Sequence, residues 1–86
     1  MTKAVFVFRT KTEVFEFADE LRARGIPSGT VGTPKEARIG CGLAVSTEAR
    51  FLSVAKKIAT SGGYGGFYGI FLVERSDKKT STTRVY

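Results

Sequence analysis

Residues 4–21 carry the stretch that decides the fold, AVFVFRTKTEVFEFADEL. It opens with an unbroken apolar run at residues 4–8, in which β-branched and aromatic side chains follow Ala4, and this run predicts a central strand that is buried on both faces. Thr10 then precedes Glu13 by three residues, the spacing of a capping box, so a helix is expected to begin here. The apolar positions that follow have the i, i+3, i+4, i+7 spacing of a helix with one buried face. They are Val14, Phe17, Ala18 and Leu21.

The rest of the chain adds two strands, a second helix and a last strand. Gly25 and Pro27 end the first helix. A second helix, with its apolar side chains on one face, is expected to begin at Ser46 or Thr47 and to end at residues 61–63. Three further strands are predicted, at residues 28–31, 43–45 and 67–73.

This order predicts an α+β protein with a ferredoxin-like βαββαβ fold. In that arrangement a four-stranded antiparallel sheet carries two helices on one face, because right-handed crossovers place both helices on the same side. We expect a single domain over residues 1–75. Residues 76–86 are rich in Ser, Thr and Lys and have little to bury, so they predict a flexible polar tail.

The composition of the 86-residue chain excludes several kinds of site. The absence of His excludes a histidine base, a histidine metal ligand and a Ser-His-Asp triad. A single Cys excludes an internal disulfide and a cysteine-rich metal site, and we expect no metal and no cofactor. No apolar run approaches the roughly 20 residues that cross a bilayer, and no signal peptide is recognised. With one free thiol, the sequence predicts a cytoplasmic protein without a membrane segment.

The charge balance favours anionic partners. Lys and Arg number 14 against 8 Asp and Glu, a net charge of +6, which suits nucleic acid, phosphates or acidic protein faces. The cations are scattered, so solvated surface charge is the alternative. Glycines and aromatics at residues 62–71 are similar to an RNA-stacking motif, but no basic residue leads them and they enter the fourth strand. We interpret them as a turn and core aromatics. The acids of the first helix are interpreted as a solvated face: Glu13, Glu16, Asp19 and Glu20.

Cys41 is the first candidate for chemistry. Gly40 and Gly42 flank it and remove side-chain cover, so a reacting partner could approach closely. Lys35 and Arg38 lie upstream and would favour the thiolate, which is the nucleophilic form of cysteine. The alternative is a small buried hydrophobic residue, a common state of free cysteine. The residues alone leave both interpretations open.

The second candidate is the whole segment of residues 33–42. Its cations, hydroxyl and glycines could cradle a small anion. The spacing is that of neither a Walker A motif nor a GxGxxG motif. An ordinary connection between two strands is the alternative, although the segment is long for a tight hairpin. The candidate binding residues are Thr33, Pro34, Lys35, Arg38, Gly40 and Gly42.

Three landmarks in order carry a family resemblance. They are Gly-Ile-Pro at residues 25–27, Thr-Pro-Lys-Glu at residues 33–36, and Cys-Gly at residues 41–42 before a short apolar strand. From about residue 3 to residue 73 the chain resembles a small bacterial family, the Se/S carrier-like proteins. The resemblance implies that Cys41 accepts sulfur or selenium and holds it as a persulfide or selenopersulfide. In two departures from the family pattern, Lys35 replaces the usual Arg, and the residues between Glu36 and Cys41 differ.

We therefore expect a carrier rather than a stand-alone enzyme. A donor protein would deliver the chalcogen to the Cys41 thiolate, and an external thiol or acceptor protein would remove it, because the chain has no second Cys. The alternative is a non-catalytic binding module for a small anionic ligand or RNA, since this fold hosts unrelated functions; nucleic acid is the less favoured partner. Open edge strands also suit a homodimer.

Overall fold

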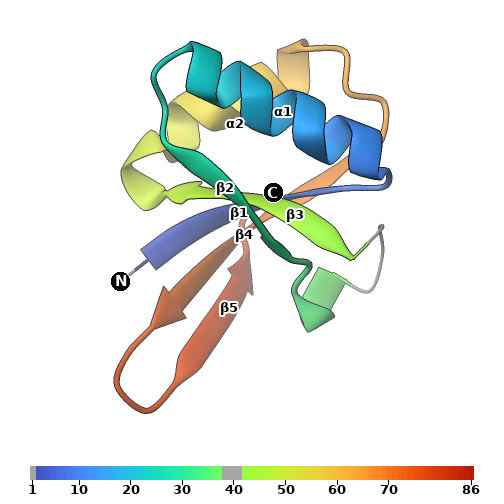
Figure 1. The fold of residues 1–86 in the computed structure, drawn as a ribbon. Helices are drawn as coiled ribbons and strands as arrows, with labels where there is room; N and C mark the ends of the chain where they lie inside the picture. Colours follow the sequence, from blue (N-terminus) through green and yellow to red (C-terminus); the bar gives the residue numbers. More distant parts are fainter. Residues whose placement is uncertain (1, 38–41) are drawn as a thin grey trace.

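The computed structural model describes residues 2–37 and 42–86. In this part of the chain, five strands form one antiparallel sheet in the order β2-β3-β1-β4-β5. Two helices, α1 (Lys11–Ala23) and α2 (Leu52–Ser61), cover one face of the sheet (Figure 1). The α+β class is thus confirmed. The strands are β1 (Thr2–Phe8), β2 (Ser28–Gly32), β3 (Leu43–Glu48), β4 (Phe67–Arg75) and β5 (Thr80–Arg84).

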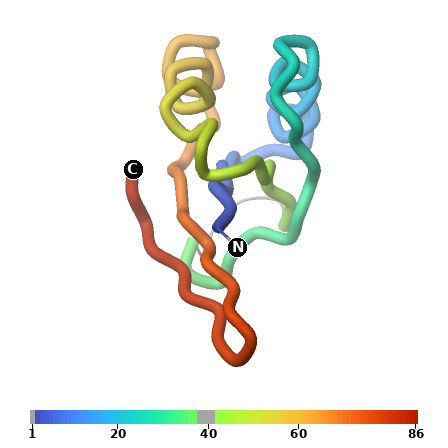
Figure 2. Tube along the Cα trace, turned by 90° about the vertical axis from the view of Figure 1, so that its left-hand side faces the viewer, coloured from blue at the N-terminus to red at the C-terminus, as the bar shows by residue number. Residues whose placement is uncertain are grey.

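Short 3-10 helices follow two of the strands. One, η1 (Lys35–Ala37), comes after β2, and the other, η2 (Ala49–Phe51), leads from β3 into α2. In Figure 2 the two helices stand side by side at one end of the molecule, and the turn between β4 and β5 lies at the opposite end. Neither helix in the described part of the chain is long and apolar enough to cross a membrane.

The predicted strand count of four is wrong, because part of the segment expected to be a tail pairs with β4. Phe71 lies opposite Arg84, and Arg75 lies opposite Thr80. Composition predicts a tail here because little apolar surface is available. Strand pairing needs only backbone donors and acceptors, and threonine favours extended backbone. With β5 at one edge and β2 at the other, the ferredoxin-like arrangement and the homodimer through an edge strand stay predictions.

β1 lies at the centre of the sheet and is buried on both faces, as its sequence predicts. Ala4, Phe6 and Phe8 face the helices and join the larger core cluster. Val5 and Val7 face the other way and join a smaller cluster. The predicted apolar face of α1 supplies much of the larger cluster, since the Phe17 ring lies 5.1 Å from the rings of both Phe6 and Phe8.

Glu13 joins α1 to the loop before β4. The Thr10 hydroxyl accepts a hydrogen bond from the Glu13 amide at 3.3 Å, as the capping-box pattern predicts. The bond to the Glu13 carboxylate comes from the Thr10 hydroxyl, at 2.9 Å, where the pattern predicts the Thr10 amide as the donor. The same carboxylate accepts from the Gly66 amide at 2.7 Å. A Cβ at residue 66 would collide with this carboxylate. Interpreting Glu13 only as a cap on a solvated face is therefore incomplete.

Glu20 makes a second long-range contact from the same helix. The Tyr64 hydroxyl donates to Glu20 Oε1 at 2.7 Å, while the Tyr64 ring packs edge-on against Phe8 and Phe17. The hydrogen bond from Tyr64, helped by Arg24, lowers the pKa of Glu20. Burial, followed by the hydrogen bond to Glu20, raises the pKa of Tyr64. The contact joins α1 to the connection between α2 and β4.

Replacing Tyr64 by Phe removes this hydrogen bond and keeps the ring. We expect Tyr64→Phe to lower the free energy of unfolding near neutral pH by about 1 kcal/mol, because a partly exposed bond to a charged acceptor contributes modestly. The pKa of Glu20 is lowered in the folded state, so its contribution is present above the ordinary value of 4.5 and is lost as the pH falls through the folded pKa. The pKa of Tyr64 is raised, so its contribution is complete below 10.0 and is lost at higher pH.

Urea unfolding at pH values from below 4.5 to above 10.0 measures the loss of the Glu20 and the Tyr64 contributions to stability. Tyr86→Phe is the matched control, because it removes the hydroxyl of a tyrosine that is 49% exposed. The difference between wild type and Tyr64→Phe should be largest at neutral pH and should shrink toward both extremes. A difference that does not change with pH would contradict the assigned bond.

Candidate functional site

A groove of about 650 Å³ lies on the face of the sheet that the helices leave open. Its floor comes from the central strands, with Val5 on β1, Ser46 on β3 and Val73 on β4. One wall is formed by residues 31–36, at the end of β2 and in η1, and the other by the β4–β5 hairpin. Figure 1 shows η1 on the side of the sheet away from α1 and α2. The groove is therefore lined by residues of all five strands and by the segment that follows β2.

The charged side chains around the groove are mostly cations. Lys3, Lys35 and Arg75 come from three different elements, and Glu36 is the one carboxylate among the lining residues that the structure describes. Between them lie the apolar floor and the hydroxyl groups of Ser46 and three threonines. A positive rim around apolar side chains suits an anion with an apolar part. The threonines are Thr33, Thr80 and Thr82.

The structure brings together the described members of the predicted binding segment. Thr33, Pro34 and Lys35 all line the groove. The Thr33 amide donates to the Gly42 carbonyl at 3.1 Å, which joins the two ends of the segment of residues 33–42. The remaining predicted members lie outside the described residues. They are Arg38, Gly40 and Cys41.

The segment is attached to the sheet by η1. The Ala37 amide donates to the Pro34 carbonyl at 3.0 Å, which closes the turn. The Ala37 side chain is buried and belongs to the smaller core cluster with Val5, Val7 and Phe71. The described part of the segment is thus folded back onto the sheet, which explains why the connection is longer than a tight hairpin requires.

Gly42 has a backbone conformation that requires glycine. Its φ angle is +87°, in the left-handed region that side chains with a Cβ rarely adopt. Among the described residues beyond its chain neighbours, no atom lies within 4 Å of the position a Cβ would take, so the preference for glycine comes from the backbone and not from crowding there. Gly42 pairs with Thr33 just before β3 begins, and a glycine after the cysteine therefore has a structural reason.

The Gly-Ile-Pro landmark fixes the other end of β2. Gly25 has a φ angle of +78° and ends α1, and Ile26 is buried in the larger core cluster. The Thr47 hydroxyl donates to the Pro27 carbonyl at 2.7 Å. Thr47 is only 2% exposed and is the buried polar residue among the described core positions, so this bond satisfies both groups.

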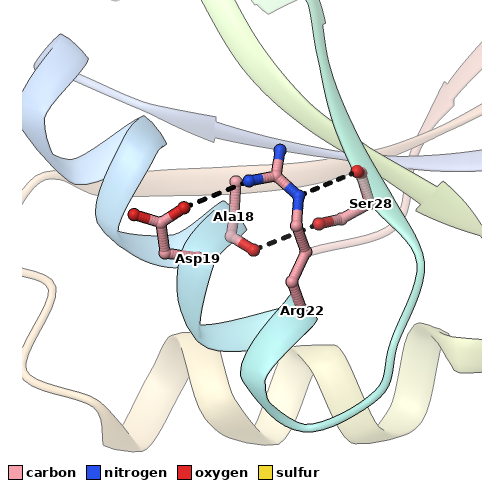
Figure 3. A network of polar contacts seen from close by, with 4 residues as sticks. All are labelled: Ala18, Asp19, Arg22 and Ser28. Atoms are coloured by element: carbon pink, nitrogen blue, oxygen red, sulfur yellow. Dashed lines mark hydrogen bonds and ion pairs between the residues drawn. The ribbon is translucent and has the colours of Figure 1, made fainter.

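Ser28 joins the start of β2 to the second half of α1 (Figure 3). The Ser28 hydroxyl donates to the Ala18 carbonyl at 3.2 Å, and Arg22 Nε donates to the Ser28 carbonyl at 3.4 Å. Arg22 also pairs with Asp19 at 3.1 Å. The strand that leads into the candidate segment is thereby held at its beginning by α1 and along its length by β3.

Sequence reasoning missed the part of the groove that lies far along the chain. Lys3, Arg75, Thr80 and Thr82 were not among the predicted site residues. One signal was available for Lys3, since it lies two residues before Val5 and therefore on the same face of β1. The positions of Arg75, Thr80 and Thr82 beside the groove depend on the register of the strands, because Val73 pairs with both Lys3 and Thr82. No group of three Cys, Asp or Glu among the described residues could hold a metal ion.

Comparison with protein families gives one match that covers most of the chain. The family described as "Putative Se/S carrier protein-like" matches residues 3–65, from β1 to the connection before β4. All three landmarks lie inside this range. No curated protein and no solved structure matches the chain.

The positive φ of Gly42 allows a direct test of the structural reason for glycine in the Cys-Gly landmark. We expect Gly42→Ala to lower the free energy of unfolding by about 1 to 2 kcal/mol, because alanine is strained at positive φ. Gly29→Ala is the matched control, since residue 29 lies in β2 without positive φ, and no described residue beyond its chain neighbours has an atom within 4 Å of an added Cβ. Urea denaturation followed by circular dichroism measures both variants. Equal stability of the two would contradict the left-handed backbone at residue 42.

Proposed function

The chain belongs to the Se/S carrier-like family, and from this premise we propose that it carries sulfur or selenium on the thiol of Cys41 and passes it to a partner protein. The observation that carries the proposal is the family match over residues 3–65, which includes the Cys-Gly landmark at residues 41–42. Cys41 is the one thiol of the chain, so it is the atom on which such cargo would be held.

Loading is an exchange at sulfur that needs no oxidant. The Cys41 thiolate attacks the terminal sulfur of a persulfide on a donor. The sulfur–sulfur bond of the donor breaks, the donor leaves as a thiolate, and a new sulfur–sulfur bond forms on Cys41. Selenium would be transferred by the same steps. The thiolate is required because a neutral thiol is a poor nucleophile.

The cations of the segment support the proposal electrostatically. Lys35 is exposed on η1, in the segment that also contains Arg38 and Cys41. Positive charge near a cysteine favours both its thiolate and an anionic persulfide. Lysine acts here as a point charge, in place of the bidentate guanidinium that is usual in the family.

Release requires a second molecule, because the chain has no second cysteine to form a disulfide. An external thiolate, on an acceptor protein or a small thiol, attacks the outer sulfur and leaves Cys41 as a thiolate. The proposal therefore includes transient donor and acceptor proteins. It also implies a reducing compartment such as the cytoplasm, where a single thiol stays free.

The experiment is to load the protein with sulfur and to measure its intact mass by mass spectrometry. Wild-type protein incubated with a low-molecular-weight persulfide is expected to gain the mass of one sulfur atom, which dithiothreitol removes, and Cys41→Ser is expected to gain nothing. We expect Lys35→Gln to load several-fold more slowly near neutral pH, because less of the thiol would be ionised. Lys57→Gln is the control, since it removes an equal charge from an exposed position on α2.

The alternative of a pure binding module makes the opposite prediction. Under that alternative, wild type takes up no reducible sulfur, and Cys41→Ser keeps every function of the protein. Uptake by wild type that Cys41→Ser does not abolish would also contradict the carrier, because the sulfur would then be held elsewhere.

A further inference from the structure

The open face of the sheet holds a groove that shares only Lys35 with the residues to which the carrier proposal gives a role. Its walls come from two segments far apart in sequence, residues 31–36 and the β4–β5 hairpin, and strand pairing through β3 and β1 sets the distance between them. Its volume of about 650 Å³ falls in the range of sites for small organic molecules, about 300 to 1,000 Å³. The groove is therefore large enough to hold a molecule with at least one ring.

The charges around this groove select for an anion. Lys3 rises from the floor on β1, Lys35 lies on one wall and Arg75 on the other, against the single carboxylate of Glu36 among the described lining residues. Cations that converge from three elements produce a stronger field in a concavity than the same charges on a flat surface. The walls also supply hydroxyl donors from Thr80 and Thr82.

The hydroxyl group of Thr33 lies beside the groove. Its side-chain oxygen is buried and has no hydrogen-bond partner among the described residues, although its residue lines the groove. Buried hydroxyl groups are nearly always paired. The apolar surface beside it comes from Val5, Val31 and Val73. The groove thus combines cations, hydroxyl groups and an apolar floor.

We propose that this groove binds a small organic anion, a phosphate or carboxylate group carried on an apolar ring. The cations and hydroxyl groups hold the anionic group, and the valines pack against the ring. The inference goes beyond the carrier function and does not depend on it: the two proposals share Lys35, but binding in the groove does not use the thiol of Cys41.

RNA fits this face less well than a small anion does. Sheet surfaces that bind RNA stack bases on exposed aromatic rings. Here Phe71 is only 2% exposed, and the Arg84 guanidinium lies 4.4 Å from the centre of the Tyr68 ring. That guanidinium also donates to the Tyr68 hydroxyl, the Tyr68 carbonyl and the Tyr86 carbonyl. These aromatics are already covered by the chain itself.

Titration with 1-naphthyl phosphate and 1-naphthoate, followed by amide chemical shifts, tests the proposal. We expect either or both to bind and to shift the amides of groove residues on β1, β4 and β5, and the stronger binder identifies the anionic group. Inorganic phosphate, which lacks the ring, and neutral 1-naphthol, which lacks the charge, should each bind at least about fivefold more weakly. Added salt should weaken binding of the anions but not of 1-naphthol.

Charge variants locate the site. Lys3→Gln and Lys35→Gln are each expected to weaken binding about threefold to fivefold, as for partly exposed charge pairs, and the double variant by about tenfold or more. Lys57→Gln on α2 should bind like wild type. Cys41→Ser should also bind like wild type, which separates this inference from the carrier proposal.

Three outcomes would overturn the inference. The first is the absence of shifts with both anions, or shifts confined to the helix side. The second is equal weakening by Lys57→Gln and Lys35→Gln, which would indicate attraction to net charge alone. The third is tighter binding of a short oligouridylate than of either naphthyl anion, with steep salt dependence and shifts across the whole sheet, which would indicate an RNA-binding face.

Discussion

The burial of β1 on both faces is the constraint on which the other elements depend. Its phenylalanines need an apolar layer on one side, and α1 and α2 provide it through Phe17 and the rest of the larger cluster. Its valines need cover on the other side, away from α1 and α2. That cover comes from neighbouring strands and from Ala37 of η1, so burying the second face also draws the segment after β2 onto the sheet.

The groove and the proposed carrier segment follow from this packing. Because Ala37 is anchored against β1, the residues just before it stand above the sheet and form a wall. The β4–β5 hairpin forms the opposite wall, and the floor between them keeps a lysine and a serine among valines. The family landmarks lie at the two ends of β2 and at the start of β3, where Gly25 and Gly42 adopt positive φ. These landmarks therefore supply the backbone conformation that positions the segment of residues 33–42, in addition to the side chains proposed for its chemistry.

The parts of the fold that could be predicted are those with local signals. A capping box, a helical apolar face and an all-apolar strand depend on residues within a few positions of one another, and α1 and β1 follow them closely. β5 has no such signal, because its stability comes from backbone pairing with β4 and not from apolar side chains. Glu13 and Glu20 resemble surface acids for the same reason: their partners, Gly66 and Tyr64, are more than 40 residues away.

For the site, the sequence by itself determined the chemical groups: one thiol, no histidine, an excess of cations and a loop of glycines and lysine. It also determined the central strand and first helix, because their patterns are periodic and local. Only the tertiary structure decided that Lys3, Lys35 and Arg75 surround one groove. Their convergence depends on strand order and register across five strands, which arise from burying both faces of β1 and not from the spacing of residues along the chain.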